Sequence, residues 1–117
     1  MPWINVTTGT ILSAEQTGKI KADFAAILLE TLAKEERGLS ISFVDPYAFY
    51  RAGEICADAA VVDIRYIGGF PLDKKREITR RMSACLNETG GFSVERTIVL
   101  FSEIASENWG RKGGDFS

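Results

Sequence analysis

Apolar and polar residues alternate near the start of the chain and then recur at helical spacing. The stretch from Trp3 to Thr7 alternates apolar with polar residues, which is typical of a half-buried strand. Ser13 and Gln16 fit a capping box at the start of a helix. The apolar face expected for that helix consists of Ile20, Phe24, Ile27, Leu28 and Leu32.

A charged segment, residues 34–37, follows this helix, and Gly38 is expected to terminate it as the C′ residue. Leu39, Ile41 and Phe43 then alternate with serines, which predicts a second strand. Residues 47–58 predict a loop or an irregular hairpin.

The second half of the chain repeats this order of elements. Residues 59–67 predict a third strand, and Pro71 suits the first turn of a second helix that Gly90 and Gly91 end. The apolar stripe of that helix is Ile78, Met82, Cys85 and Leu86. Residues 96–101 predict a buried strand, and the remaining residues predict a short hairpin or arm.

The repeat of strand, helix and strand, offset by about 58 residues, defines the expected fold class. We predict an α+β domain over residues 1–117, in which two β-α-β repeats form a four-stranded sheet with two helices on one face. The expected divisions are about 2–57, about 58–104 and a C-terminal arm at 105–117. The other face of the sheet is too apolar to face water, which predicts an oligomer.

Composition excludes several classes of function. The chain has 117 residues, of which 45% are hydrophobic and 26% charged, with a net charge of −2. This profile fits an ordinary globular domain and offers no basic footprint for nucleic acid. No apolar run reaches the roughly 20 residues of a membrane span. We find no charged-then-apolar leader, so the expected location is the cytoplasm.

The chain contains no histidine and only two cysteines, Cys56 and Cys85. Triads built on histidine and most zinc sites are therefore excluded, and the cysteines fit no metal spacing, so no metal site is predicted. Both cysteines are expected to be buried thiols. Acid–base chemistry near neutral pH is then left to a shifted carboxylate, lysine or cysteine, or to an N-terminal amine.

Pro2 directly follows Met1 and directly precedes the first predicted strand. If Met1 is removed, the chain begins with a secondary amine on a rigid ring, which can act as a general base or nucleophile. If Met1 is retained, that nitrogen is an amide without base chemistry. The bland alternative is that Pro2 is simply tolerated at the second position.

These features together resemble the tautomerase superfamily. The resemblance rests on Pro2 after Met1, the two β-α-β units, and the C-terminal segments 108–110 (Asn-Trp-Gly) and 113–114 (Gly-Gly). The superfamily includes 4-oxalocrotonate tautomerase, macrophage migration inhibitory factor and malonate semialdehyde decarboxylase. It implies a cofactor-independent homotrimer acting on a small carboxylate-bearing 2-oxo acid or enol, with active sites near subunit interfaces.

The resemblance also implies roles for particular residues. Pro2 carries over as the base, and its burial would disfavour the protonated amine. Arg65 is expected to hold a substrate carboxylate and to stabilise an enolate; its alternative is an ion pair with Asp63. Lys34 and Arg37 compete for a substrate-binding position, although a charged helix exit is usually only solvated.

Ile67 is expected to form an apolar wall of the pocket, and Trp109 fits the aromatic residue that closes it in the family. Trp109 could equally be an interface anchor. The usual electrophilic partners of the family are mostly missing, because Leu12, Ile98 and Leu100 stand where its branches carry arginine, tyrosine and asparagine.

Three functions stay open on this basis. The first is a keto–enol tautomerase that uses Pro2. The second is a dehalogenase, hydratase or decarboxylase of a small unsaturated or 3-oxo acid, which needs a water-activating carboxylate; Asp45, Glu103 and Glu107 are the candidates. The third is a non-catalytic binding trimer, if Met1 is retained.

Overall fold

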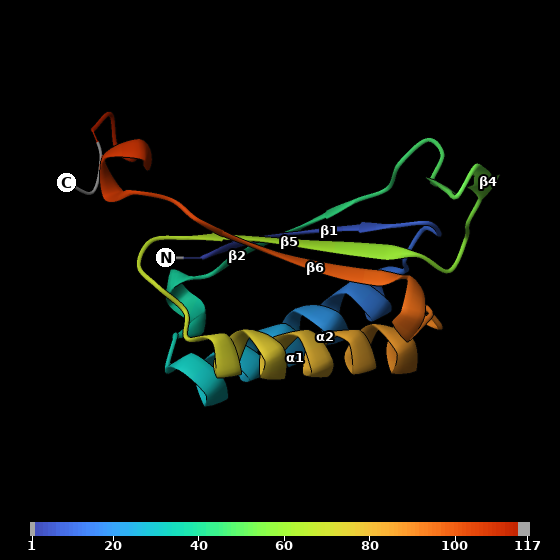
Figure 1. Ribbon diagram of the computed structural model, residues 1–117, viewed down its shortest axis with the longest axis horizontal. Coiled ribbons are helices and arrows are strands. Elements are labelled where there is room, and N and C mark those ends of the chain that lie inside the picture. Colours follow the sequence, from blue (N-terminus) through green and yellow to red (C-terminus); the bar gives the residue numbers. More distant parts are fainter. Residues whose placement is uncertain (1, 115–117) are drawn as a thin grey trace.

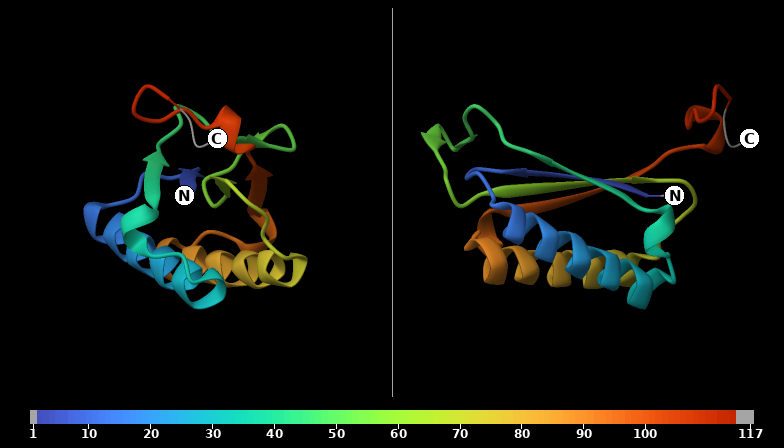
Figure 2. Two further views of the ribbon diagram at one scale, coloured as in Figure 1. Left: turned by 90° about the vertical axis from the view of Figure 1, so that its left-hand side faces the viewer. Right: turned by 180° about the vertical axis from the view of Figure 1, so that it is seen from behind.

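The computed structural model describes residues 2–114 of the chain, so Met1 and residues 115–117 lie outside it. Two helices, α1 (Ala14–Leu32) and α2 (Leu72–Gly90), cover one face of a four-stranded sheet (Figure 1). The helices run in opposite directions beneath the sheet, and the opposite face of the sheet has no layer over it (Figure 2).

The strands are β1 (Trp3–Thr8), β2 (Ser40–Val44), β5 (Ala60–Tyr66) and β6 (Thr97–Glu103), in the order β2-β1-β5-β6. β1 pairs in parallel with β2, and β5 pairs in parallel with β6. The central pair, β1 and β5, is antiparallel and brings Trp3 opposite Arg65. Each repeat therefore supplies one central strand and one edge strand.

Alternation along the strands divides core from surface. The even-numbered residues of β1 and β5 point toward the helices and are buried, while their odd-numbered neighbours lie on the uncovered face. The core shared with the helices includes Ile4, Val6, Phe24, Leu28, Val62, Ile64, Ile78, Met82 and Leu86. This arrangement confirms the predicted fold class.

The repeat extends to the short turns after each helix. α1 and α2 each contain 19 residues and begin at Ala14 and Leu72, an offset of 58. The 3-10 turns η1 (Glu36–Gly38) and η2 (Val94–Arg96) differ by the same offset. The proposed division of the chain near residue 57 stays a prediction.

At the ends of α1, the structure confirms the predicted start and shows that the predicted end was wrong. Ser13 and Gln16 form the predicted capping box at the start of α1. The helix does not end at Gly38, however, because Ala33 already adopts the left-handed conformation, with φ of 54°, directly after Leu32. Gly38 was a misleading signal because the backbone already turns at Ala33, before the charged segment begins. Gly91 ends α2 as predicted.

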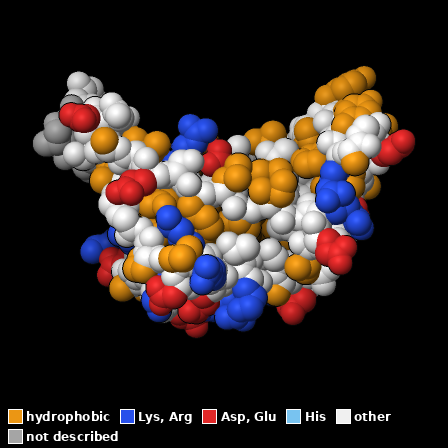
Figure 3. Space-filling view, in the orientation of Figure 1, with side chains coloured by type: hydrophobic (Ala, Val, Ile, Leu, Met, Phe, Trp, Pro, Cys, Tyr) orange, Lys and Arg blue, Asp and Glu red, His pale blue; other side chains and the backbone are white. Residues whose placement is uncertain are grey.

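Two segments project from the ends of the sheet, away from the helices (Figure 1). One is the predicted irregular hairpin, formed by β3 (Tyr50–Arg51) and β4 (Glu54–Ile55). The other contains η3 (Ser106–Asn108) and a tight turn bridged between Arg111 and Gly114. Hydrophobic side chains gather on the hairpin projection (Figure 3). The last residues of the predicted arm, 115–117, lie outside the described part.

Two further observations bear on the sequence predictions. No helix within residues 2–114 is long and apolar enough to cross a lipid bilayer. Cys85 is buried as expected, and burial is the main cause that raises the pKa of its thiol to about 12. Cys56 is only half-buried, contrary to the prediction, because it precedes β5 in a connection at the edge of the fold.

Candidate functional site

Pro2 occupies a defined position at the start of β1. It continues the even-numbered positions whose side chains face the helices, and it is buried. Its carbonyl accepts a hydrogen bond of 3.2 Å from the Ser40 N–H at the start of β2. The pyrrolidine ring is therefore held where the sheet meets the end of α1.

Pro2 lines a cavity of about 280 Å³, which we call the Pro2 cavity. The turn after α1 builds most of its wall, because the left-handed Ala33 lets the Lys34 N–H donate to the Leu28 carbonyl at 3.2 Å. That bond folds the following segment back toward the start of β1. The lining residues are Pro2, Ala33, Lys34, Glu35, Arg37 and Gly38.

The charges around the Pro2 cavity are unequal. Arg37 forms an ion pair with Glu35, with Nε 2.6 Å from a carboxylate oxygen, so its charge is already partly compensated. Lys34 makes no ion pair with any residue in the described range 2–114. Lys34 is thus the cation of this cavity that is best able to receive the carboxylate of a small ligand. The structure brings together three predicted residues, Pro2, Lys34 and Arg37.

Glu35 is the residue at this cavity that the sequence reasoning missed. It supplies the carboxylate of the cavity wall, whereas none of the sequence candidates Asp45, Glu103 and Glu107 lines it. Asp45 follows the far end of β2 and lines a different hollow. The position of Glu35 in the sequence could have identified it, because it lies between two predicted substrate-binding cations.

Arg65 lies on the other face of the sheet. Its odd-numbered position on β5 points away from the helices, and it does not line the Pro2 cavity. Its guanidinium contacts Asp63 at 3.3 Å and lies 5.7 Å from the centre of the Trp3 ring, within reach of a cation–π interaction. The ion pair with Asp63, which was the alternative role for Arg65, is therefore present. The catalytic role of Arg65 stays a prediction.

Ile67 and Trp109 also lie outside the Pro2 cavity as this single chain forms it. Ile67 directly follows β5 and is half-buried, and Trp109 directly follows η3 in the C-terminal projection. Their roles in substrate binding stay predictions.

The uncovered face of the sheet mixes polar and apolar side chains. Trp3 donates to the Ser42 hydroxyl at 3.0 Å, and that hydroxyl donates to Asn5 at 2.7 Å. On β6, the edge strand at the opposite side of the sheet, Ile98 and Leu100 are 52% and 47% exposed. Half-exposed apolar residues on a sheet face are typical of a surface that is covered in an assembly.

No group of three or more His, Cys, Asp or Glu residues within 2–114 lies close enough together to hold a metal ion. The Pro2 cavity presents instead a ring nitrogen, two cations and one carboxylate. The two cations can bind a small anion, and the Pro2 nitrogen becomes a base only if Met1 is removed.

No protein-family model matches the chain, and no curated protein matches it by sequence. Among solved structures, MIF2 of Leishmania major has a TM-score of 0.85 and 23% identity, covering 99% of this chain and 97% of that chain. A fused 4-OT described as an asymmetric trimer has a TM-score of 0.86 and 14% identity, covering 97% and 94%. A protein inactivated by 2-oxo-3-pentynoate has a TM-score of 0.85 and 15% identity, covering 96% and 93%. The chain therefore shares its fold with MIF2 and with the fused 4-OT.

Proposed function

We propose that this chain is a cofactor-independent tautomerase of a small 2-oxo acid or its enol, with Pro2 as the general base after removal of Met1. The observation that carries the proposal is the burial of Pro2 in the wall of a cavity that also holds Lys34 and Arg37. The shared fold with MIF2 and the fused 4-OT supports the same class of activity.

The proposed chemistry needs only a proton shift. The Pro2 nitrogen takes a proton from the carbon beside the 2-oxo group, and the electron pair of that bond moves to form the enolate. The protonated Pro2 amine then passes a proton to the enolate oxygen, directly or through water, which restores the neutral amine, and the reverse sequence converts the enol to the ketone. Lys34 holds the substrate carboxylate and favours the negative charge that develops beside it.

The surroundings of Pro2 suit a neutral amine. Burial disfavours the charged form of an amine, and the cations Lys34 and Arg37 in the same cavity act in the same direction. Glu35 opposes this effect, but its carboxylate is engaged by Arg37. An amine that is neutral near physiological pH can accept the substrate proton.

We propose further that the active assembly is a homotrimer. The uncovered sheet face and the two projections offer surfaces for neighbouring copies (Figure 1). In such an assembly, Arg65, Ile67 and Trp109 would act at subunit interfaces, where a neighbouring chain brings them near a Pro2 cavity. Size-exclusion chromatography with light scattering tests the trimer independently of activity.

Replacement of Pro2 tests the proposed base. The Pro2→Ala variant retains an N-terminal amine but loses the rigid ring, so we expect ketonisation of phenylenolpyruvate to slow by at least about a hundredfold. Pro46→Ala is the matched control, because Pro46 lies outside the Pro2 cavity. Unchanged kcat/KM in Pro2→Ala would contradict the proposal.

A covalent probe tests the amine itself. 2-Oxo-3-pentynoate carries an alkyne conjugated to a carbonyl group, and a neutral amine adds across that triple bond with no leaving group. Intact-mass analysis is expected to show loss of Met1 and, after treatment, the added mass of one inhibitor per chain. Peptide mapping is expected to place that added mass on the peptide that begins with Pro2. Retained Met1 in protein from its own host would favour the non-catalytic binding trimer.

The carboxylate of Glu35 gives the second candidate function a specific basis. A carboxylate beside the Pro2 cavity can activate water, which hydration or dehalogenation of an unsaturated acid requires. We would measure turnover of 3-haloacrylates and of malonate semialdehyde by wild type and Glu35→Gln. Turnover that Glu35→Gln abolishes would support this second function, and its absence in wild type would exclude these substrates.

A further inference from the structure

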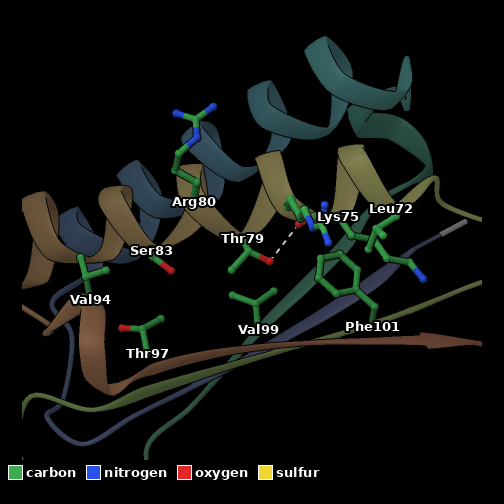
Figure 4. A pocket seen from close by; sticks show the side chains of 10 residues that line it. Leu72, Lys75, Thr79, Arg80, Ser83, Val94, Thr97, Val99 and Phe101 are labelled. Carbon is green, nitrogen blue, oxygen red and sulfur yellow. Dashed lines mark hydrogen bonds between the residues drawn. The ribbon is translucent and has the colours of Figure 1, made fainter.

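A larger cavity, of about 560 Å³, lies between α2 and β6 and shares no lining residue with the Pro2 cavity. Leu72 lies at one end and Val94 at the other, and Val99 and Phe101 point from β6 toward the helix (Figure 4). We call this elongated cavity the α2–β6 groove. Its volume falls within the roughly 300–1,000 Å³ of small-molecule sites, which favours a small ligand over a macromolecule.

The walls of the α2–β6 groove offer few free polar groups. The Thr79 hydroxyl donates to the Lys75 carbonyl at 2.8 Å, and the Thr97 hydroxyl donates to the Ser93 carbonyl at 2.7 Å. Both donors are therefore used within their own backbone segments. The groove consequently presents mainly apolar surface from Leu72 to Val94.

The charges along the groove have one sign. Lys75, Arg76 and Arg80 line it, and no acidic residue does. Within residues 2–114, these three cations make no ion pair. Some helical cations elsewhere are paired: Lys19 contacts Asp23 at 3.0 Å and Lys21 contacts Glu36 at 3.1 Å.

We propose that the α2–β6 groove binds a small amphipathic anion, namely an unbranched aliphatic chain that ends in a carboxylate. The carboxylate lies against Lys75 and Arg76 near the start of α2, and the chain extends past Val99 toward Val94. An elongated apolar groove with unpaired cations near one end matches such a molecule in both shape and charge. Arg80 turns away from β6 in Figure 4 and contributes at the outer rim.

Titration of the full-length protein with decanoate tests this proposal. In ¹⁵N-labelled protein, we expect saturable shifts of the amide signals of α2 and β6, with affinity measured in parallel by calorimetry. The Lys75→Glu/Arg76→Glu variant is expected to bind decanoate at least about tenfold more weakly, because it reverses both charges at the carboxylate end.

Lys74→Glu provides the matched control, because Lys74 carries the same charge on the same helix but does not line the groove. Its affinity is expected to stay within about threefold of wild type, since exposed charges at a distance are screened. Two further probes separate the ends of the ligand: butyrate lacks the long chain, decanol lacks the charge, and both should bind more weakly than decanoate.

Several results would overturn the proposal. These are no saturable decanoate binding, equal loss in Lys74→Glu and the double variant, equal affinity for decanol, or shifts confined to the Pro2 cavity or the uncovered sheet face. Binding of anionic phospholipid vesicles or an acidic peptide to the groove without decanoate binding would also overturn it. The amide shifts of wild type locate the ligand even if the charge variants fail to fold.

Discussion

The two β-α-β repeats leave their helices through the same backbone turn but fill that turn with different side chains. The Lys34 N–H donates to the Leu28 carbonyl at 3.2 Å, and 58 residues later the Phe92 N–H donates to the Leu86 carbonyl at 3.4 Å. Lys34 lines the Pro2 cavity, whereas Phe92 is only 1% exposed. One repeat therefore presents a cation to a cavity where the other seals the core with an aromatic ring.

Other residues of the second repeat are consistent with a buried Phe92 ring at the end of α2. Gly90 leaves the space that the Phe92 ring occupies, because a Cβ at residue 90 would overlap that ring. Arg96 and Asp58 close the adjoining surface with two hydrogen bonds of 2.9 and 2.6 Å. The comparison shows that the backbone of the repeat is shared, while a few side chains decide whether its end is a cavity or a core.

The largest effect is expected from giving the second repeat the side chain of the first. Phe92→Lys removes a buried ring and leaves a cation in apolar surroundings, so we expect the free energy of unfolding to fall by about 4 kcal/mol or more. Urea denaturation measures the change. The reciprocal Lys34→Phe should alter stability by less than about 1 kcal/mol, because Lys34 lies at the surface of a cavity. Comparable losses in both variants would contradict the distinction.

The functional side of the comparison rests on Lys34. Lys34→Ala should lower kcat/KM for a 2-oxo acid or its enol by about ten- to a hundredfold, because a charge-assisted contact to the substrate carboxylate is lost. Arg96→Ala, which changes a cation at the sealed end, should leave kcat/KM unchanged. Steady-state kinetics on both variants measures this, and an equal loss in Arg96→Ala would argue against a site at the first repeat alone.

An intermediate effect is expected at Gly90. Gly90→Ala places a methyl group against the Phe92 ring, which must shift, so we expect a loss of about 2 kcal/mol in unfolding free energy. The double variant Gly90→Ala/Phe92→Ala relieves the overlap, and a double-mutant cycle should therefore show coupling between the two sites. Strictly additive losses would show that the ring can move at no cost.

The two left-handed turn residues predict a smaller pair of changes. Ala33 and Gly91 have φ of 54° and 73°, and only glycine adopts this region without steric cost. We expect Ala33→Gly to raise the unfolding free energy and Gly91→Ala to lower it, each by about 1 kcal/mol. Thermal denaturation compares the two, and changes of the same sign would refute the shared turn.

The smallest effect concerns the pH dependence of the sealed end. The hydrogen bonds from Arg96, followed by that from Cys56, hold the pKa of Asp58 at about 2, below its usual 3.8. A carboxyl whose pKa is lower in the folded state stabilises the fold above the unfolded value, and this contribution is lost as the pH falls from about 4 to 2. Asp58→Asn should therefore lose less stability than wild type across that window. Because the pair is exposed to solvent, the difference should be small, and identical acid profiles would contradict it.

Much of the fold could be predicted from local patterns. The alternation in β1 and the capping box of Ser13 and Gln16 depend on neighbouring residues, so the sequence displays them directly. The end of α1 was predicted wrongly, because a left-handed alanine at residue 33 carries no signal comparable to that of Gly38. The hydrophobic pattern of a sequence also does not show which strands are neighbours in the sheet. It therefore does not show which residues line the same cavity.

The candidate site could be predicted from the sequence only in part. Pro2, Lys34 and Arg37 were proposed from the sequence and line one cavity, yet Glu35 between them was missed. Arg65 was assigned to the same chemistry, but within this chain it lies on the opposite face of the sheet. Ile64 and Tyr66 are buried against the helices, so Arg65, which lies between them on β5, must point to the opposite face of the sheet.

By itself, the sequence determined the order of elements, their duplication and the residues that carry charge, because these follow from short-range periodicity and composition. Only the tertiary structure decided that the end of α1 opens beside Pro2 while the end of α2 closes over Phe92. The reason is physical: both ends share one backbone turn, and the outcome depends on which side chains distant strands bring against it.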